Sequence, residues 1–265
     1  MKVYISADIE GLAGISHWDE ARKEQAVYQE FRNEMTEEVV AACDGAIAAG
    51  ATEILIKDAH ATGRNIIASR LPDCARLIRG WSGHPLAMVQ ELDKTFDALL
   101  LIGYHSKAGT QDNPLAHTLT LQIGGLSLNG ELASEFRLHS YAAGLYGVPV
   151  VFLSGDKGIC AEAAKQVPGI ATAAVSEGRG ASTISITPKV AQGMIREGVA
   201  AALKGDRSRC QVKLPESFVL EVTFNNPIDA YRKGFYPGAS QSGPQTVRFA
   251  HKDYFEILRA IRFIM

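Results

Sequence analysis

The 265-residue sequence has few cysteines and no long apolar run. Its four cysteines are scattered and form no C-x-x-C pair, which excludes a disulfide framework and a thiolate zinc site. No apolar stretch reaches the ~18 residues that a membrane span needs. The N-terminal residues lack the basic and apolar regions of a signal peptide. We therefore expect a cytoplasmic protein that has no membrane partner.

An excess of charge of one sign is also lacking. The formal net charge is -2 at pH 7 and no basic run interrupts the sequence, so nothing electrostatic favours nucleic acid as a partner. The fingerprints of phosphate-binding loops, of dinucleotide-binding folds and of the G-x-S-x-G nucleophile elbow are absent as well. Nucleotide-dependent and serine-hydrolase chemistry are therefore not indicated.

Short apolar segments that alternate with amphipathic helical patterns are present along most of the chain. The predicted buried strands are Val3–Ala7, Glu53–Lys57, Asp97–Gly103 and Val148–Leu153. Near-continuous apolar strands of this kind are typical of a parallel sheet that is covered on both faces. The sequence therefore predicts an α/β fold with a mostly parallel sheet and helices on both faces.

The composition turns polar between Gly205 and Pro215, which suggests a boundary. We expect residues 1–205 to form a catalytic, metal-binding α/β domain and residues 206–265 a smaller α+β part. Leu119–Leu128 alternates around the Gly124–Gly125 pair, a pattern that predicts an antiparallel hairpin. A hairpin within residues 117–130 does not extend a parallel series, so we expect it to pack with the second part.

Metal-capable side chains follow three of the predicted strands. Asp8 and Glu10 end the first strand, and side chains at i and i+2 of an extended segment point the same way. His60 and His105 follow two later strands. Because parallel strands end at the same edge of a sheet, these groups can converge without being sequence neighbours. Carboxylates with imidazoles suit Zn, and also Mn or Co.

Five short motifs occur in a fixed order along the chain. They are ADIEG (Ala7–Gly11), KDAH (Lys57–His60), GYH (Gly103–His105), AHT (Ala116–Thr118) and a Glu-led helix that precedes YGVPV (Tyr146–Val150). Each motif alone is weakly specific, but in this order and spacing the set resembles the zinc D-aminopeptidases of peptidase family M55.

The resemblance implies roles for particular residues. The implied ligands of two zinc ions per subunit are Asp8, Glu10, His60, His105 and Glu135. Glu131, which lies four residues before Glu135, is the competing candidate for the fifth ligand. His117 matches the catalytic histidine of the family, and a proton shuttle or an oxyanion contact is the role expected of it.

The resemblance also implies an activity and an assembly. The activity is that of a metallo-aminopeptidase, a hydrolase that removes the N-terminal residue, preferentially a D-residue, from short peptides. The assembly is a ring-shaped homo-oligomer, a decamer, with its sites facing an inner channel. Two other functions stay open: a metal-dependent deacylase or phosphoesterase, and a non-catalytic cytoplasmic peptide-binding protein.

Overall fold

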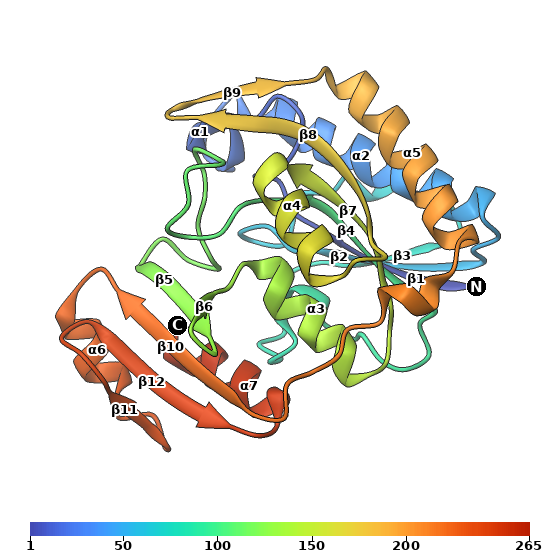
Figure 1. The fold of residues 1–265 in the computed structure, drawn as a ribbon. Coiled ribbons are helices and arrows are strands. Elements are labelled where there is room, and N and C mark those ends of the chain that lie inside the picture. The colour runs from blue at the N-terminus through green and yellow to red at the C-terminus, as the bar shows by residue number, and fades with distance from the viewer.

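The largest element of the computed structural model, which describes residues 1–265, is a seven-stranded sheet (Figure 1). Across the sheet the strands are β3 (Ala75–Ile78), β2 (Glu53–Asp58), β1 (Lys2–Ala7), β4 (Ala98–Tyr104), β7 (Val150–Asp156), β8 (Ala171–Arg179) and β9 (Ser182–Ser185). Neighbouring strands are parallel except β8 and β9, which pair antiparallel. The predicted mostly parallel sheet is confirmed.

Helices cover both faces of this sheet. On one face α2 (Tyr28–Ala48) packs beside α5 (Pro188–Lys204), and on the other lie α3 (Glu135–Leu145) and α4 (Lys157–Gln166) (Figure 1). A short helix, α1 (Trp18–Ala21), precedes α2. Every residue of β4 and β7 is buried, which explains their continuous apolar sequences. The helical coverage agrees with the expectation from the sequence.

The order of the strands reverses between β1 and β4. From β1 the chain crosses to β2 on one side, and from β4 it proceeds to β7 and β8 on the other side. Right-handed crossovers on the two sides of this point place α2 and α3 on opposite faces. Such a switch point leaves a crevice outside the carboxyl ends of the strands, where open α/β sheets bind their ligands.

A second, five-stranded antiparallel sheet lies beside the first. Its strands are β11 (Ala239–Gln241), β12 (Thr246–His251), β10 (Phe218–Phe224), β5 (Ile123–Leu128) and β6 (Glu131–Leu132). It therefore combines the middle of the chain with the C-terminal part. Two helices accompany it, α6 (Pro227–Lys233) and α7 (Tyr254–Ile264) (Figure 1).

The predicted position of the hairpin turn is wrong. Gly124 and Gly125 lie inside the continuous strand β5, and the turn that joins β5 to β6 is Asn129–Gly130. Both turn residues have positive φ, 53° and 82°, which a two-residue type I′ turn requires. Asn-Gly is a strong signal for such a turn, because Asn tolerates positive φ at the first position better than most side chains and Gly adopts it freely at the second.

α7 is fixed against α3, and this contact sets where the C-terminus lies. Tyr254 is buried at the start of α7, and its hydroxyl donates to the carbonyl of Leu138 at 2.8 Å. Its ring packs against those of Tyr141 and Phe218. The last turn of α7 thereby borders the crevice at the sheet edge. None of the helices has the length and apolar character that crossing a bilayer would require.

Candidate metal centre

Two glycines bring the ends of β1 and β4 into close contact at the switch point. A Cβ on Gly11 would lie 1.8 Å from the carbonyl oxygen of Tyr104, and one on Gly103 would lie 2.3 Å from that of Asp8. Gly103 also has a φ of 71°, which side chains disfavour. With both positions free of Cβ atoms, Asp8 and Glu10 sit directly beside His105, and all three are buried.

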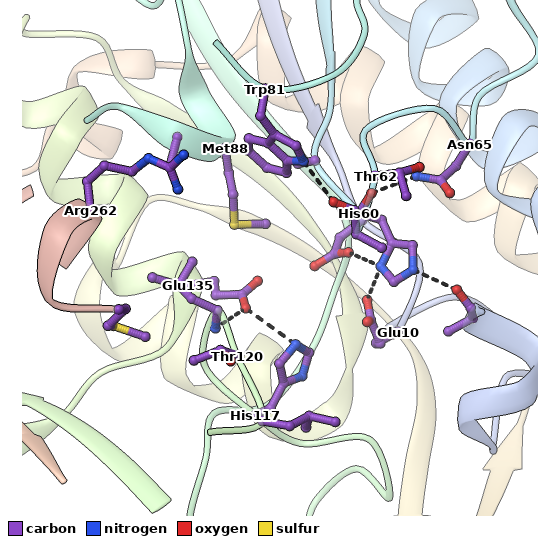
Figure 2. Close-up of a pocket in the computed structure, with 18 of the residues that line it drawn as sticks. Glu10, His60, Thr62, Asn65, Trp81, Met88, His117, Thr120, Glu135 and Arg262 are labelled. Atoms are coloured by element: carbon purple, nitrogen blue, oxygen red, sulfur yellow. Dashed lines mark hydrogen bonds and ion pairs between the residues drawn. The ribbon is translucent and has the colours of Figure 1, made fainter. Parts of the chain in front are cut away.

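His60, which follows β2, directs one ring nitrogen at the two carboxylates. Its Nδ1 lies 3.0 Å from Glu10 Oε2 and 3.3 Å from Asp8 Oδ1. Its Nε2 lies 2.8 Å from the carbonyl oxygen of Ala21 (Figure 2). Because a carbonyl only accepts, Nε2 carries the hydrogen and the lone pair of the neutral ring is on Nδ1. That lone pair faces the acids.

His105 repeats this arrangement with its nitrogens exchanged. Its Nδ1 donates to the carbonyl of Ser106 at 2.9 Å, which leaves the lone pair on Nε2. Nε2 lies 3.5 Å from Asp8 Oδ2 and 3.4 Å from Glu135 Oε2. It is fully buried and has no hydrogen-bond partner. A buried, unpartnered lone pair between two carboxylates is the arrangement that a divalent cation would complete.

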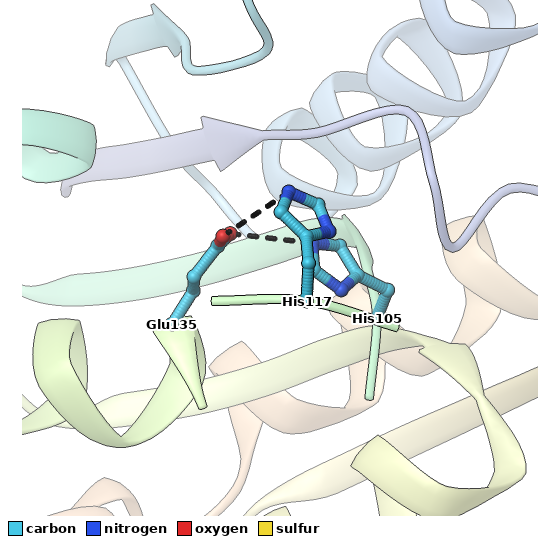
Figure 3. Close-up of side chains that lie close together, drawn as sticks. All are labelled: His105, His117 and Glu135. Carbon is cyan, nitrogen blue, oxygen red and sulfur yellow. Dashed lines mark ion pairs between the residues drawn. The ribbon is translucent and has the colours of Figure 1, made fainter. Parts of the chain in front are cut away.

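His117 stacks on His105, with ring centroids 4.3 Å apart and planes at 6° (Figure 3). Its Nδ1 donates to the carbonyl of Leu115 at 2.9 Å, so its lone pair is on Nε2, 3.8 Å from Glu135 Oε1. The backbone N–H of Leu119 donates to that same carboxylate oxygen at 2.7 Å and fixes it. The side chain of His117 is 13% exposed, against 1% for His105, so it borders the open space.

The charges of the carboxylates dominate the electrostatics. Burial alone would lower the pKa of both histidines, but the neighbouring acids raise it well above the usual value. Glu10 and Asp8 raise the pKa of His60. Glu135 and Asp8 raise the pKa of His105. Burial raises the pKa of Asp8, but the two neighbouring imidazoles, His105 and His60, favour its charged form and lower it well below its usual value. The negative charge that favours protons on these lone pairs also attracts a divalent cation, which would replace them.

The structure thus brings together all six residues that the sequence singles out. Asp8 is central: Oδ1 faces His60, which also contacts Glu10, and Oδ2 faces His105, which also contacts Glu135. The competing acid, Glu131, is elsewhere. Its side chain is 66% exposed and pairs with Arg137 at 2.6 Å. The donor set of carboxylate oxygens and imidazole nitrogens fits zinc.

Sequence reasoning missed Asp156, the last residue of β7, which lies at the same edge of the sheet. Its buried carboxylate accepts from the N–H of Ser106 at 2.6 Å, from the N–H of Ile159 at 2.9 Å and from the side-chain amide of Asn113 at 3.1 Å. Asn113 in turn donates to the carbonyl of Glu10 at 2.9 Å. Asp156 therefore fixes the loop that carries His105. An acid at the end of a buried strand was the available signal.

A cavity of about 630 Å³ opens in front of these groups. Asp8, Glu10, His60, His117 and Glu135 line one side of it, and side chains from the segment before β4 and from α7 line another (Figure 2). The volume is within the range of small-ligand sites. The arrangement can hold a small polar ligand against the buried carboxylates.

Three comparisons with known proteins agree with this geometry. The model of the M55 peptidase family, described as D-aminopeptidase, matches residues 1–263. A D-aminopeptidase of Bacillus subtilis (strain 168) is 32% identical over 263 residues, which are 98% of this chain and 95% of that protein. The solved structure of the Zn-dependent D-aminopeptidase DppA from Bacillus subtilis, described as a self-compartmentalizing protease, superposes with a TM-score of 0.92 at 30% identity. The match covers 100% of this chain and 96% of that one.

Proposed function

This chain belongs to the M55 family of D-aminopeptidases, and we propose that it is a zinc aminopeptidase that removes an N-terminal D-residue from short peptides. The observation that carries the proposal is the buried, unpartnered Nε2 of His105 between Asp8 and Glu135. The similar proteins are named as peptidases, so a phosphoesterase, a deacylase and a binding protein are not favoured.

We propose two zinc ions per subunit, which share Asp8. Oδ1 of Asp8, Glu10 and Nδ1 of His60 would hold one, and Oδ2 of Asp8, Nε2 of His105 and Glu135 would hold the other. The support is that each histidine already presents its lone pair to a different oxygen of Asp8. Zinc bound there would lower the pKa of water toward neutrality and polarise the scissile carbonyl.

His117 is proposed as the residue that moves the proton. Its Nδ1–H is held by the carbonyl of Leu115, so only Nε2 is free to accept a proton from water and donate it to the leaving amine. Stacking on His105 and an edge contact with Trp18, with ring centroids 5.2 Å apart, keep the ring facing the cavity. The substrate's free α-amine would bind at this centre, to zinc or to one of the carboxylates, which would explain aminopeptidase rather than endopeptidase action.

A ring-shaped homo-oligomer, a decamer, is proposed as the assembly. The similar Bacillus structure is described as self-compartmentalizing. On this chain α6 and its surroundings expose several large apolar side chains together: Ile228, Tyr231 and Phe235 are 65%, 62% and 72% exposed, and Phe263 of α7 is 64% exposed. Such a patch is unusual on a monomer and fits contact with a second copy. The cytoplasmic location stays a prediction.

The test is hydrolysis of the para-nitroanilides of D-Ala and L-Ala by the zinc-loaded protein and by His117→Gln. We expect faster turnover of the D-substrate, and a kcat for His117→Gln that is lower by about 10²- to 10⁴-fold with unchanged zinc content. His251→Gln, which changes an exposed histidine at the end of β12, is the control and should match the wild type. Turnover of acetyl or phosphate esters alone would contradict the proposal.

A further inference from the structure

The carboxylates of the centre and one arginine, Arg262, line different sides of the cavity. The buried carboxylates of Asp8, Glu10 and Glu135 lie on one side. On the other side Arg262 reaches in from the last turn of α7 toward Met88, across the cavity from Glu10 and His60 (Figure 2). Two further cations line the cavity, Arg22 and Lys23. They follow Ala21, whose carbonyl binds His60, so they lie on the side of the carboxylates.

The guanidinium of Arg262 is anchored but not neutralised. Its Nε donates to the carbonyl of Gly83 at 3.3 Å, and no carboxylate of the chain forms an ion pair with it. The two Nη groups have no partner in the protein. On the preceding turn of the same helix Arg259 behaves differently, because its Nη1 is held by Glu256 at 2.9 Å. Arg262 is thus an unpaired, oriented cation that faces the cavity.

Apolar side chains line the cavity beside Arg262. Met88 comes from the segment before β4, and Leu258 and Ile261 come from the cavity face of α7. All three are buried. A ligand that matches this lining has an amino group at the end that faces the centre, small apolar groups beside Arg262 and an anion at the other end. A short peptide with a free amino and a free carboxyl terminus has these groups in this order.

We propose that Arg262 binds the C-terminal carboxylate of the substrate, and that the site therefore selects short peptides with a free C-terminus. The proposal rests on the aminopeptidase function, because that function places the substrate's N-terminus at the carboxylate side. With Nε committed to Gly83, the two Nη groups form the planar pair of donors that a carboxylate accepts. The cavity thus selects for peptide length as well as for the residue that is removed.

The experiment compares D-Ala-D-Ala with its C-terminal amide as substrates of the wild type, Arg262→Gln and the control Arg259→Gln. The readout is the ratio of kcat/KM on the free dipeptide to kcat/KM on the amide. We expect Arg262→Gln to reduce this ratio by about 10- to 100-fold, mainly through KM, because a charge-assisted bond is lost. Arg259→Gln should retain the wild-type ratio, and Arg262→Lys should restore part of it.

The remaining outcomes distinguish a failure of the Arg262 inference from a failure of the proposed aminopeptidase function. Equal losses on dipeptide and amide in Arg262→Gln would assign the arginine a structural role and overturn the inference. A wild type that does not distinguish dipeptide from amide would overturn it as well. In both cases hydrolysis of the amide by the wild type would leave the aminopeptidase function standing. Hydrolysis of neither substrate by the zinc-loaded wild type would instead refute that function, and this inference with it.

Discussion

A buried acid on α2 makes the stability of the protein depend on pH. Glu38 is fully buried, its Oε1 accepts from the N–H of Ala13 at 3.1 Å, and its Oε2 has no partner. Burial raises the pKa of Glu38 to about 8, against the opposing effect of the Ala13 hydrogen bond. The carboxyl is therefore neutral in the folded protein at pH 7. Ala13 lies in the loop that carries Glu10, so its hydrogen bond with Glu38 holds the loop that follows β1.

The sign and size of the effect follow from the two pKa values. In the unfolded chain the pKa of Glu38 returns to 4.5, so between 4.5 and 8 the folded state binds more protons than the unfolded state. The stability that the neutral carboxyl contributes is fully present below pH 4.5 and is lost as the pH rises through 8. From pH 6 to pH 8 the loss is about 2 kcal/mol, which corresponds to roughly 4 °C in Tm.

The assay is thermal unfolding of the wild type and of Glu38→Gln from pH 6 to pH 8. The glutamine keeps an oxygen that can accept from Ala13 and has no proton to lose in this range, so its Tm should fall less than that of the wild type. The difference between the two proteins cancels other titrations. Glu30→Gln, an exposed change on the same helix, should keep the wild-type dependence. Parallel curves for the wild type and Glu38→Gln would show that Glu38 does not titrate between pH 6 and pH 8.

Three further predictions concern the centre itself. Gly103→Ala places a Cβ 2.3 Å from the carbonyl oxygen of Asp8, so we expect the free energy of unfolding, measured by denaturation, to fall by about 2 kcal/mol or more and bound zinc to decrease. The control Gly193→Ala, on α5 with no atom near the new Cβ, should stabilise the protein by about 0.5–1 kcal/mol in the same assay. Asp156→Asn weakens the bonds that fix Ser106, so competition with a chelator should show zinc affinity reduced about 10- to 100-fold. Dialysis against a chelator should lower Tm reversibly. The stabilisation that is removed is up to about 4 kcal/mol, the value for a protein kept at a zinc concentration near 1,000 times Kd. An unchanged Tm would count against a structural contribution from metal.

The sequence was informative where the backbone alone brings residues together. Asp8, His60 and His105 each end a strand of one parallel sheet, and parallel strands place their ends at one edge whatever their separation in the chain. Glu131 lies in β6 and faces solvent, whereas Glu135 is the first residue of α3 and is buried at the centre, and this difference depends on where α3 begins after the Asn129–Gly130 turn. Periodicity does not reveal such a detail.

Contacts between segments that are distant in the chain could not be predicted from the sequence. Asp156 acts through Asn113 and Ser106, whose positions depend on how a long loop folds back. Arg262 reaches the cavity only because Tyr254 docks α7 on α3. Neither residue belongs to a local pattern. The division of the chain after residue 205 stays a prediction, although β5 and β6 join the sheet formed by the C-terminal strands.

The shared metal centre can be tested by the zinc content of the purified protein, measured per chain for the wild type, Asp8→Asn and Glu131→Gln. Because Asp8 faces both histidines, the account predicts about two zinc ions in the wild type, a marked loss from both positions in Asp8→Asn, and no change in Glu131→Gln, whose carboxylate is exposed and paired with Arg137. A wild type that binds one zinc ion or none after reconstitution, or an Asp8→Asn protein that keeps two, would contradict the shared centre.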